Sequence, residues 1–423
     1  MIRKTLLGLV ILTCAVWFIS RPASYHQIGE QRTIGPIPEE LLKADIGDVI
    51  AAEMVTIAED VPGHDEVLHI PGTNKLLVSA RDEWIWEVDT ASGKARKLVY
   101  SPVSPTGAKM VPGSTHLAYF CMARLDYNHY PHGPGLYLLD ISKAKFEPVV
   151  TRVPITGELR EDGLELPNSD EPNTAKVYPA PLNETVLTAL DNHNSRPMQF
   201  CNDLDISSDG RHVYMSEPFS HPKASSGLGA LPEAITLARN GRIWRYDTKA
   251  QTVGLVVENA IFADGVLIEY DPQGREQSLL ITETVNFLIS RAHLSGNRAG
   301  QYDTLWDNLP GLPDGMDRDS EGRVWVGFIK DRSPLMTWMH ANPWIKPLLL
   351  RIPSKWLAGS SSGTGFMVMS RNASEIIAYS HHSGEKVRDL SVVIPVEDKL
   401  FLSSFFERNK GVHFVPIGSI LEH

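Results

Sequence analysis

A unit of two apolar strands joined by a turn recurs six times along this chain, and it constrains the fold more than any other feature. Each copy runs from an apolar strand through a Gly or Asp turn into a second apolar strand that ends in small or acidic residues. Six similar β units predict an all-β fold, a six-bladed β-propeller whose blades surround a common axis. The copies are residues 65–80, 107–121, 202–217, 264–283, 314–328 and 390–404.

Each blade is expected to contain four strands. After the opening pair, segments of alternating apolar and polar residues end in Asp at 84–89, 136–140 and 243–247. Such alternation is typical of half-buried antiparallel strands. Two strands in the repeat and two after it therefore make up the predicted blade.

The length and net charge of the chain indicate a large globular domain that does not bind nucleic acid. The chain has 423 residues, of which 42% are hydrophobic, enough to bury the core of a large ring. The formal net charge is −11. Because phosphate binding needs a basic surface, this charge argues against nucleic acid as a partner.

Four of the six copies begin with Asp or Asn, namely Asp65, Asn202, Asp264 and Asp314. In a propeller, equivalent positions of the inner strands converge on the axis, so these side chains are expected to meet. An all-oxygen donor set favours Ca²⁺, with Mg²⁺ and Mn²⁺ as alternatives, over Zn²⁺. The structural alternative is that Asp and Asn serve only as turn residues at strand starts. Their equivalence in four repeats favours a metal site.

The N-terminal 21 residues differ from the rest of the chain. Arg3 and Lys4 precede an apolar run over residues 6–19, which is the pattern of an export signal or a membrane anchor. No small-residue cleavage motif follows, which favours a retained anchor over a cleaved signal. The positive-inside rule then predicts a membrane-anchored or secreted domain in a periplasm, a lumen or the extracellular space.

This pattern divides the chain into three predicted parts. Residues 1–21 are a signal peptide or membrane anchor, 22–60 are a leader that supplies a closing strand, and 61–423 form the propeller. A further segment, residues 333–350, is apolar and aromatic. It is interpreted either as a helix packed on the propeller, or as a hydrophobic lid over the pocket or a patch touching the membrane.

Cys121 and Cys201 are the two cysteines of the predicted propeller. In an oxidising compartment they could pair, but two cysteines do not make a disulfide framework. The interpretation favoured by the sequence is a pair of buried thiols in strands, with a disulfide as the alternative.

Several motifs carry a resemblance to known families. Residues 312–316 (LPDGM), followed by 322–326 (GRVWV), resemble the signature of the gluconolactonase/regucalcin (senescence marker protein) family. Residues 201–204 (CNDL) resemble the Asn-bearing blade of that family and of the paraoxonases. Residues 261–266 (IFADGV) resemble a phrase of strictosidine synthase-like proteins and paraoxonases, and 296–313 is most similar to the strictosidine synthase-like branch, which includes membrane-anchored members. Together the resemblance covers roughly residues 60–417.

The resemblance implies a six-bladed propeller with a divalent cation, usually calcium, on its axis. In lactonase members the ligands are Glu, Asn, Asn and Asp, which correspond here to Asp65, Asn202, Asp264 and Asp314. Two positions depart from that pattern, because Asp65 replaces Glu and Asp264 replaces Asn. All four remain oxygen donors, and Glu66 is the alternative ligand if the register of the first copy differs by one residue.

Two further departures concern the substrate and the catalytic groups. Sugar lactonases carry an Arg two residues before the Asn ligand, whereas this chain has Phe200, which favours an apolar substrate over a sugar lactone. Paraoxonases use a His pair above the calcium. The first His corresponds to Thr106 here, and His129 and His132 lie near the second. His129 is kept as a catalytic candidate, with a polar surface role as the alternative.

The sequence therefore predicts a divalent-cation-dependent hydrolase that acts on a lactone or ester of an apolar small molecule. The cation would polarise the carbonyl, and Asp314 or Asp264 would act as general base on a water molecule. One alternative is a strictosidine synthase-like enzyme of specialised metabolism that does not hydrolyse its substrate. Another is a non-catalytic binding propeller, anchored in a membrane through the N-terminal segment.

Overall fold

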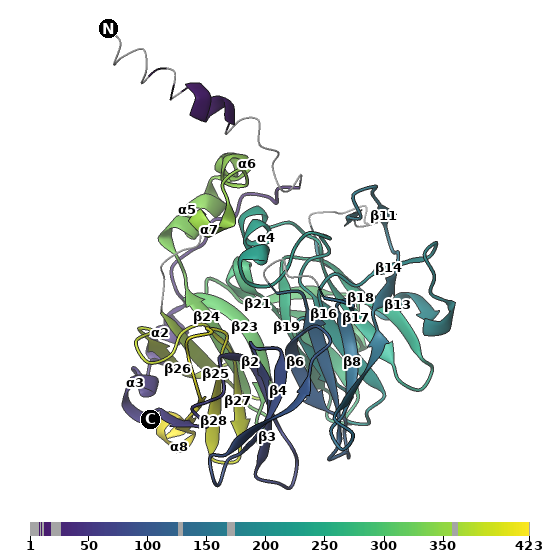
Figure 1. The fold of residues 1–423 in the computed structure, drawn as a ribbon. Coiled ribbons are helices and arrows are strands. Elements are labelled where there is room, and N and C mark those ends of the chain that lie inside the picture. The colour runs from purple at the N-terminus through teal and green to yellow at the C-terminus, as the bar shows by residue number, and fades with distance from the viewer. Residues whose placement is uncertain are drawn as a thin grey trace.

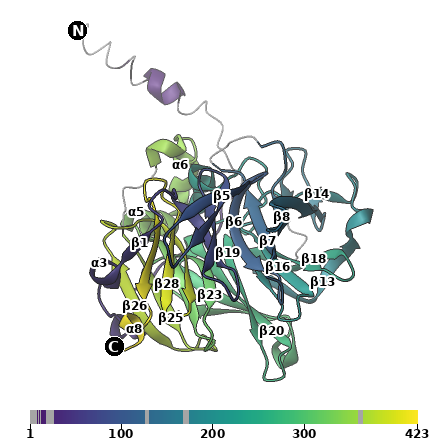
Figure 2. The ribbon, with the colours of Figure 1, turned by 60° about the horizontal axis from the view of Figure 1, so that its bottom comes forward.

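Six β-sheets stand around a central axis in the computed structural model, which describes residues 8, 10, 12–17, 27–125, 130–166, 174–357 and 363–422 (Figures 1 and 2). Inner strands of neighbouring sheets contact each other all the way around the ring. The predicted all-β, six-bladed propeller is confirmed.

Each blade is an antiparallel sheet that runs from an inner strand at the axis to an outer strand at the rim. The first two blades consist of β2 (His64–His69), β3 (Lys75–Ala80), β4 (Trp84–Asp89) and β5 (Ala95–Tyr100), and of β6 (Ser104–Met110), β7 (Leu117–Ala123), β8 (Gly135–Asp140) and β9 (Lys145–Val150). The fourth and fifth consist of β19 (Ala263–Tyr270), β20 (Glu276–Glu283), β21 (Leu288–His293) and β22 (Tyr302–Trp306), and of β23 (Gly311–Arg318), β24 (Val324–Asp331), β25 (Thr364–Met369) and β26 (Ile376–His382).

The third blade has an additional strand. Its inner four strands are β15 (Leu204–Ile206), β16 (His212–Glu217), β17 (Gly241–Asp247) and β18 (Thr252–Ala260). The earlier strand β13 (Lys176–Val186) pairs with β18 as a fifth, outermost strand. Two short ribbons lie outside the blades, β10 (Arg152–Pro154) with β14 (Ser195–Pro197), and β11 (Glu158–Leu159) with β12 (Glu165–Leu166).

The sixth blade joins the two ends of the propeller chain. Its strands β27 (Leu390–Val396), β28 (Lys399–Ser404) and β29 (Val412–Pro416) are completed by β1 (Val55–Ile57), which comes from the N-terminal side. Val55 lies opposite Phe414 in this pairing. The short helices α3 (Val49–Glu53) and α8 (Gly418–Leu421) pack against β29 of this closing blade and β26 of the fifth, and α2 (Glu39–Lys43) packs against β26.

The core consists of the apolar faces of adjacent blades packed against each other. Leu77 and Ile85 of the first blade, for example, share a buried cluster with Ala108 and Phe120 of the second. The alternating strands bury one face against each neighbour, so the hydrophobic effect holds the blades side by side. This rigid ring fixes where the first residue of every inner strand lies.

One end of the ring, which we call the helical end, carries the inserted helices (Figure 1). These are α4 (Leu231–Thr236), α5 (Pro334–Ala341), α6 (Lys346–Leu349) and α7 (Ser354–Leu357), with the 3₁₀ turns η2 (Gly227–Ala230) and η5 (Pro343–Ile345). Ile235, Met339 and Leu350 join α4 to the α5–α7 insertion in one buried cluster. Other 3₁₀ turns are η1 (Leu187–Ala189), η3 (Thr284–Asn286) and η4 (Gly296–Arg298).

The predicted signal or anchor falls largely outside the described residues. Positions 8, 10 and 12–17 are helical, and Leu12 and Trp17 among them are exposed. Among the residues described, no helix combines the length and the apolar character needed to cross a bilayer.

Candidate functional site

The inner strands share a local irregularity at the residues that open each repeat. In five blades the register of the inner strand shifts against its neighbour there, between His64 and Val67, Pro105 and Ala108, Ala263 and Val266, Pro313 and Met316, and Leu390 and Val393. A β-bulge turns a side chain away from the regular alternation. The bulges thus present the opening residues to the axis rather than to a neighbouring blade.

Glycines allow these strands to approach closely. A Cβ atom on Gly265 would lie 2.5 Å from the carbonyl oxygen of Asp314, and one on Gly315 would lie 2.7 Å from Cβ of Val392. Any larger residue would push adjacent inner strands apart. The Asp-Gly pairs at 264–265 and 314–315 therefore combine a polar group on the axis with tight strand packing.

The four opening residues Asp65, Asn202, Asp264 and Asp314 all line one cavity of about 840 Å³. This cavity opens at the helical end, because residues of α4, α5 and α7 also line it. Asp264 and Asp314 are buried. The structure thus brings together the four residues that the repeat predicts to meet, while Glu66 points to a different layer of the axial channel.

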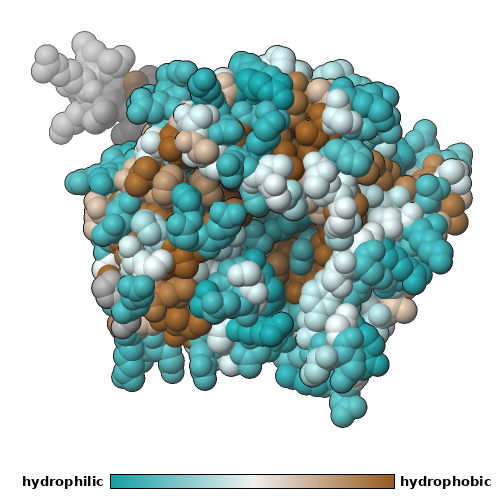
Figure 3. All heavy atoms as spheres, turned by 90° about the horizontal axis from the view of Figure 1, so that it is seen from below, coloured by the Kyte–Doolittle hydropathy of each residue, from teal (hydrophilic) through white to brown (hydrophobic). Residues whose placement is uncertain are grey.

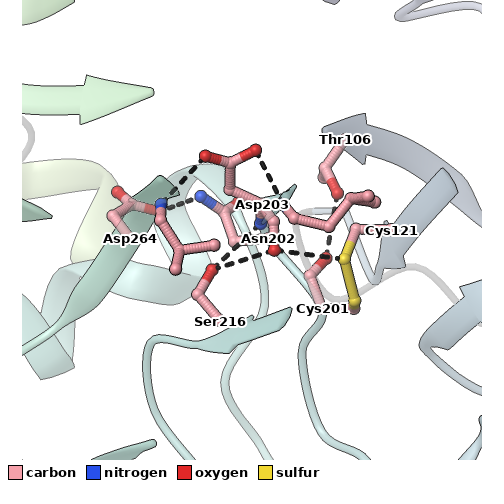
Figure 4. The surroundings of a disulfide bond; sticks show 9 residues. Thr106, Cys121, Cys201, Asn202, Asp203, Ser216 and Asp264 are labelled. Atoms are coloured by element: carbon pink, nitrogen blue, oxygen red, sulfur yellow. Dashed lines mark hydrogen bonds between the residues drawn. A yellow bond between two sulfur atoms is a disulfide. The ribbon is translucent and has the colours of Figure 1, made fainter. Parts of the chain in front are cut away.

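Direct hydrogen bonds connect these side chains. Nδ2 of Asn202 donates to Oδ1 of Asp264, and the hydroxyl of Thr284 donates to Oδ2 of Asp264 at 2.7 Å. Figure 4 shows Asn202 and Asp264 pointing toward one another. Asp264 and Asp314 also share a hydrogen bond. Both oxygens of Asp264 are therefore held in place.

The pKa values of the three carboxyl groups are raised. Burial is the main cause, and it raises the pKa of Asp65 to about 6 and the pKa of Asp264 to about 7. Burial and the neighbouring charges of Asp264 and Asp65 raise the pKa of Asp314 well above its ordinary value. Converging carboxylates of this kind favour either a shared proton or a bound cation.

The oxygen atoms of the four opening residues are suitable ligands for a hard divalent cation. Their side chains are, however, not arranged around a common point as ligands of a bound ion would be. Among the described residues, no group of three or more His, Cys, Asp or Glu side chains is arranged to hold a metal ion. The side chains are instead hydrogen-bonded to one another. A rotation of the Asn202 amide would turn its oxygen, in place of its nitrogen, toward the carboxylates, and the four residues would then offer only oxygen donors.

A second layer of charges lies deeper in the axial channel. The carboxyl groups of Glu66, Asp203, Asp205 and Asp317 surround the ammonium of Lys109, which lies 2.8 Å from Asp317 Oδ1. Glu66, Lys109 and Asp317 also line a smaller cavity of about 310 Å³. Figure 3 shows the end of the ring opposite the helices, with a hollow near its centre.

The cavity walls are largely apolar. Phe200 and Phe219 contact each other edge to face with ring centroids 4.9 Å apart, and Phe262 packs on Phe219. Leu231 and Met336 extend this apolar wall toward the helices. The predicted apolar neighbour of Asn202, Phe200, thus belongs to an aromatic group that lines the cavity.

The histidine candidates do not complete the site. His129 lies outside the described residues, so its catalytic role stays a prediction. His132 is exposed and is not among the residues that line the cavity. Thr106 is buried, and its hydroxyl donates to the carbonyl oxygen of Cys201 at 2.9 Å, which is a structural contact.

Cys121 and Cys201 form a disulfide, so the favoured interpretation of two buried thiols is wrong. Their Cα atoms are 4.9 Å apart. The two residues are 80 positions apart in the sequence, and the ring brings β7 next to the segment that precedes β15. Figure 4 shows that this disulfide adjoins Asn202, so the covalent link fixes the chain next to a candidate ligand.

Sequence reasoning missed a second ring of residues. The position directly after each sequence repeat lines the cavity in five blades: Arg81, Pro218, Thr284, Ile329 and Phe405. In this ring the guanidinium of Arg81 lies 3.7 Å from the centroid of the Phe405 ring. The signal in the sequence was the register of the repeats, because each of these residues directly follows one repeat copy.

Comparison with known proteins supports the resemblance. No protein-family model matches the chain. An adipocyte plasma membrane-associated protein of Salmo salar is 36% identical over 164 residues, which are 38% of this chain and 38% of that protein. Strictosidine synthase-like protein 13 of Arabidopsis thaliana is 31% identical over 189 residues, 44% of this chain and 45% of that protein. The matched segments thus span less than half the length of these relatives.

Solved structures show a similar fold at low sequence identity. A putative gluconolactonase superposes with a TM-score of 0.51 and 11% identity, over 86% of this chain and 91% of that one. A gluconolactonase of Xanthomonas campestris gives 0.50 and 13%, over 94% and 99%. The predicted resemblance is confirmed: the chain is similar in sequence to the adipocyte plasma membrane-associated and strictosidine synthase-like proteins, and similar in fold to the gluconolactonases.

Proposed function

We propose that this protein is a divalent-cation-dependent hydrolase, with Ca²⁺ as the preferred ion, that opens a lactone or cleaves an ester of an apolar small molecule. One observation carries the proposal: three carboxylates and an amide from four blades line an otherwise largely apolar cavity of about 840 Å³. The gluconolactonase names of proteins with the same fold are consistent with it.

Asp65, Asn202, Asp264 and Asp314 would hold the cation. When bound, a hard divalent cation polarises a carbonyl oxygen and offsets the negative charge that develops during attack by water. The cavity walls of Phe200, Phe219 and Phe262 hold the apolar part of the substrate and exclude bulk water.

A carboxylate of the site would take a proton from the attacking water. The oxygens of Asp264 accept from Asn202 and Thr284, which suits a fixed, orienting group. Asp314 is therefore the better candidate for the general base. The water oxygen bonds to the acyl carbon, the bond from that carbon to the ester oxygen breaks, and the proton taken from water passes to the departing oxygen.

A metal titration of Asp314→Asn tests this function. We expect wild-type protein to bind about one divalent ion and to lose ester or lactone hydrolysis when a chelator is added. Asp314→Asn should lower hydrolysis about 10²–10⁴-fold, the usual contribution of a general base. Asp398→Asn, at an exposed position, is the matched control and should behave like wild type. Retained hydrolysis by a variant that binds no metal would sink the proposal.

Two other functions remain to be separated by experiment. The strictosidine synthase-like relative favours, as a second candidate, an enzyme of specialised metabolism that does not use water. Product analysis distinguishes them, because hydrolysis incorporates oxygen from ¹⁸O-labelled water into the acid product. For a non-catalytic binding propeller, no ester or lactone would be hydrolysed, whether or not elemental analysis finds a bound ion.

We also propose that the propeller lies outside the cytoplasm, either membrane-anchored or secreted. The Cys121–Cys201 disulfide supports an oxidising compartment. The basic and apolar pattern of residues 1–21 and the membrane-associated relatives support the same location. Protease accessibility of the domain in sealed vesicles tests the orientation.

A further inference from the structure

The helices inserted in the fifth blade expose an unusual group of large apolar side chains. The exposed fractions are 65% for Trp344 and Trp356, 60% for Leu335, 46% for Trp338 and 43% for Leu348. All five belong to the insertion of α5, η5, α6 and α7 at the helical end (Figure 1). We call these five side chains the lid surface. Gathered exposed Trp and Leu residues mark a contact with another apolar surface.

The charge of this insertion differs from that of the whole protein. Residues 333–357 contain three cations, Lys346, Arg351 and Lys355, and no Asp or Glu, although the chain carries a net charge of −11. Lys355 is exposed and Arg351 is half-buried, whereas Lys346 is fully buried and donates to the carbonyl oxygen of Thr236 at 3.2 Å, so that Lys355 and Arg351 are the two cations of the insertion's surface. Trp, Leu and basic residues without acids are the composition of segments that lie at the interface of an anionic bilayer.

The chain toward the N-terminus leaves the propeller at the same place. Ile28 packs against the cluster of Ile235, Met339 and Leu350, and the amide of Gly29 donates to the carbonyl oxygen of Thr236 in α4 at 2.9 Å. The apolar run over residues 6–19 ends eight residues before residue 27, and eight extended residues reach at most about 28 Å. Chain length therefore keeps the end of that run within about 28 Å of residue 27.

We propose that the lid surface lies on a lipid bilayer, with its tryptophans at the level of the headgroups. This inference goes beyond the proposed function and does not depend on it. Two points favour a lipid surface over a protein partner. A bilayer accepts exposed Trp and Leu side chains without a complementary shape, and the apolar run over residues 6–19 is attached to the same end of the protein.

The other side of the same insertion lines the candidate site. Met336, Met339, Leu349 and Leu357 face the cavity. Leu335 belongs to both the cavity wall and the lid surface. A lid surface on a bilayer would thus bring the cavity mouth to the lipid, and the substrate class becomes a lipid-dissolved ester or lactone. This second step rests on the proposed hydrolase function.

Quenching of tryptophan fluorescence by brominated lipids tests the contact. The full-length protein carries Trp17→Phe in all samples, so that the N-terminal tryptophan does not contribute. Vesicles contain three parts phosphatidylcholine brominated on its acyl chains and one part phosphatidylglycerol. We expect strong quenching, and its loss in Leu335→Ser/Leu348→Ser, which keeps all three lid tryptophans as reporters. Val186→Ser/Ile377→Ser, exposed at the rim of the blades, should be quenched like the parent.

The outcomes separate the occupants of the lid surface. In the Trp338→Ser/Trp344→Ser/Trp356→Ser variant, vesicle affinity should fall at least about tenfold, since interfacial binding scales with buried apolar area. Vesicle-bound protein with unquenched lid tryptophans would overturn the proposal. Sedimentation equilibrium without lipid that reveals a dimer dissolved by the triple substitution would overturn it in favour of a second copy of the chain.

Hydrolysis of two esters tests the second step. A short, water-soluble ester should be hydrolysed equally by the parent and by Trp338→Ser/Trp344→Ser/Trp356→Ser, none of which lines the cavity, whereas a long-chain ester dissolved in the vesicles should be hydrolysed at least about tenfold more slowly by the variant. Equal rates on both esters would refute entry from lipid. If the parent hydrolyses neither ester while quenching persists, the proposed function fails and the bilayer contact stands.

Discussion

The ammonium of Lys109 donates to Oδ1 of Asp317 at 2.8 Å inside the axial channel. Burial alone would lower the pKa of Lys109, but the charges of Asp317, Glu66 and other carboxylates outweigh burial and raise it. The ammonium of Lys109, in β6 of the second blade, thus balances the negative charge of the carboxylates in this deeper layer.

Replacing Lys109 by Met should destabilise the fold by about 3–5 kcal/mol, because it removes the ammonium charge that balances several buried carboxylates. The measurement is urea denaturation at neutral pH. Lys145→Met, which breaks an exposed pair with Glu147, is the control and should change stability little. Equal stability of Lys109→Met and wild type would contradict this account of the channel.

Removing the Thr284 hydroxyl should weaken ion binding. Thr284→Val keeps the shape but leaves Oδ2 of Asp264 without the 2.7 Å hydrogen bond. Loss of one such contact to a charged group is expected to lower Ca²⁺ affinity about tenfold, or by ~1.5 kcal/mol. Isothermal titration calorimetry measures it, and Thr284→Ser should restore affinity. If valine and serine variants bind alike, the hydroxyl has no role in orienting Asp264.

The disulfide should stabilise both the fold and the site. Replacing Cys121 and Cys201 by Ala removes a link across 80 residues and should cost about 2–5 kcal/mol in the free energy of unfolding. Cation affinity should also fall, because Asn202 follows Cys201 directly. Differential scanning calorimetry and ion titration measure the two effects. Cys14→Ala, at an exposed free thiol, is the control and should leave both unchanged.

Acid stability should depend on the buried Glu165. Burial raises its pKa, but the charges of Arg242 and Arg196 outweigh burial and lower the pKa from 4.5 to about 2. A lowered pKa in the folded state means that this carboxylate stabilises the fold above pH 4.5 and loses that contribution as the pH falls toward 2. The contribution lost is about 3 kcal/mol.

Denaturation at several pH values checks this expectation. The stability difference between wild type and Glu165→Gln should be largest above pH 4.5 and should shrink steadily below it. Glu161→Gln, at an exposed position, should follow wild type throughout. A difference between wild type and Glu165→Gln that stays constant from pH 5 to pH 2 would rule out the ion pairs with Arg196 and Arg242 as its cause.

Much of the ring could be predicted because its information is local and repeated. The apolar alternation of segments such as 84–89 defines a strand, and six copies define the number of blades. The insertions were harder, because α4 is only six residues long and has no periodic pattern to detect. Its residues are helical because tertiary packing on Met339 and Leu350 holds them there.

The residues of the candidate site could be predicted from the sequence, whereas the contacts between them could not. Asp65, Asn202, Asp264 and Asp314 could be found because each opens a repeat. Their mutual hydrogen bonds and the closeness of Lys109 to Asp317 depend on how inner strands of different blades are staggered, which no single repeat encodes. The pairing of Cys121 with Cys201 was missed for the same reason, since two cysteines in different blades carry no sequence signal of their distance.

The closing strand has a consequence for the order in which the protein forms. The hydroxyl of Ser391 in β27 donates to the carbonyl oxygen of Asp65 in β2 at 2.7 Å, which joins the sixth blade to the first at the axis. β1 pairs with β29, so this blade is complete only after β29 has been synthesised. Contacts of such long sequence separation form late. Until β29 pairs with β1, the first five blades therefore form an open arc, and Asp65 lacks the contact with Ser391 that joins its strand to the sixth blade.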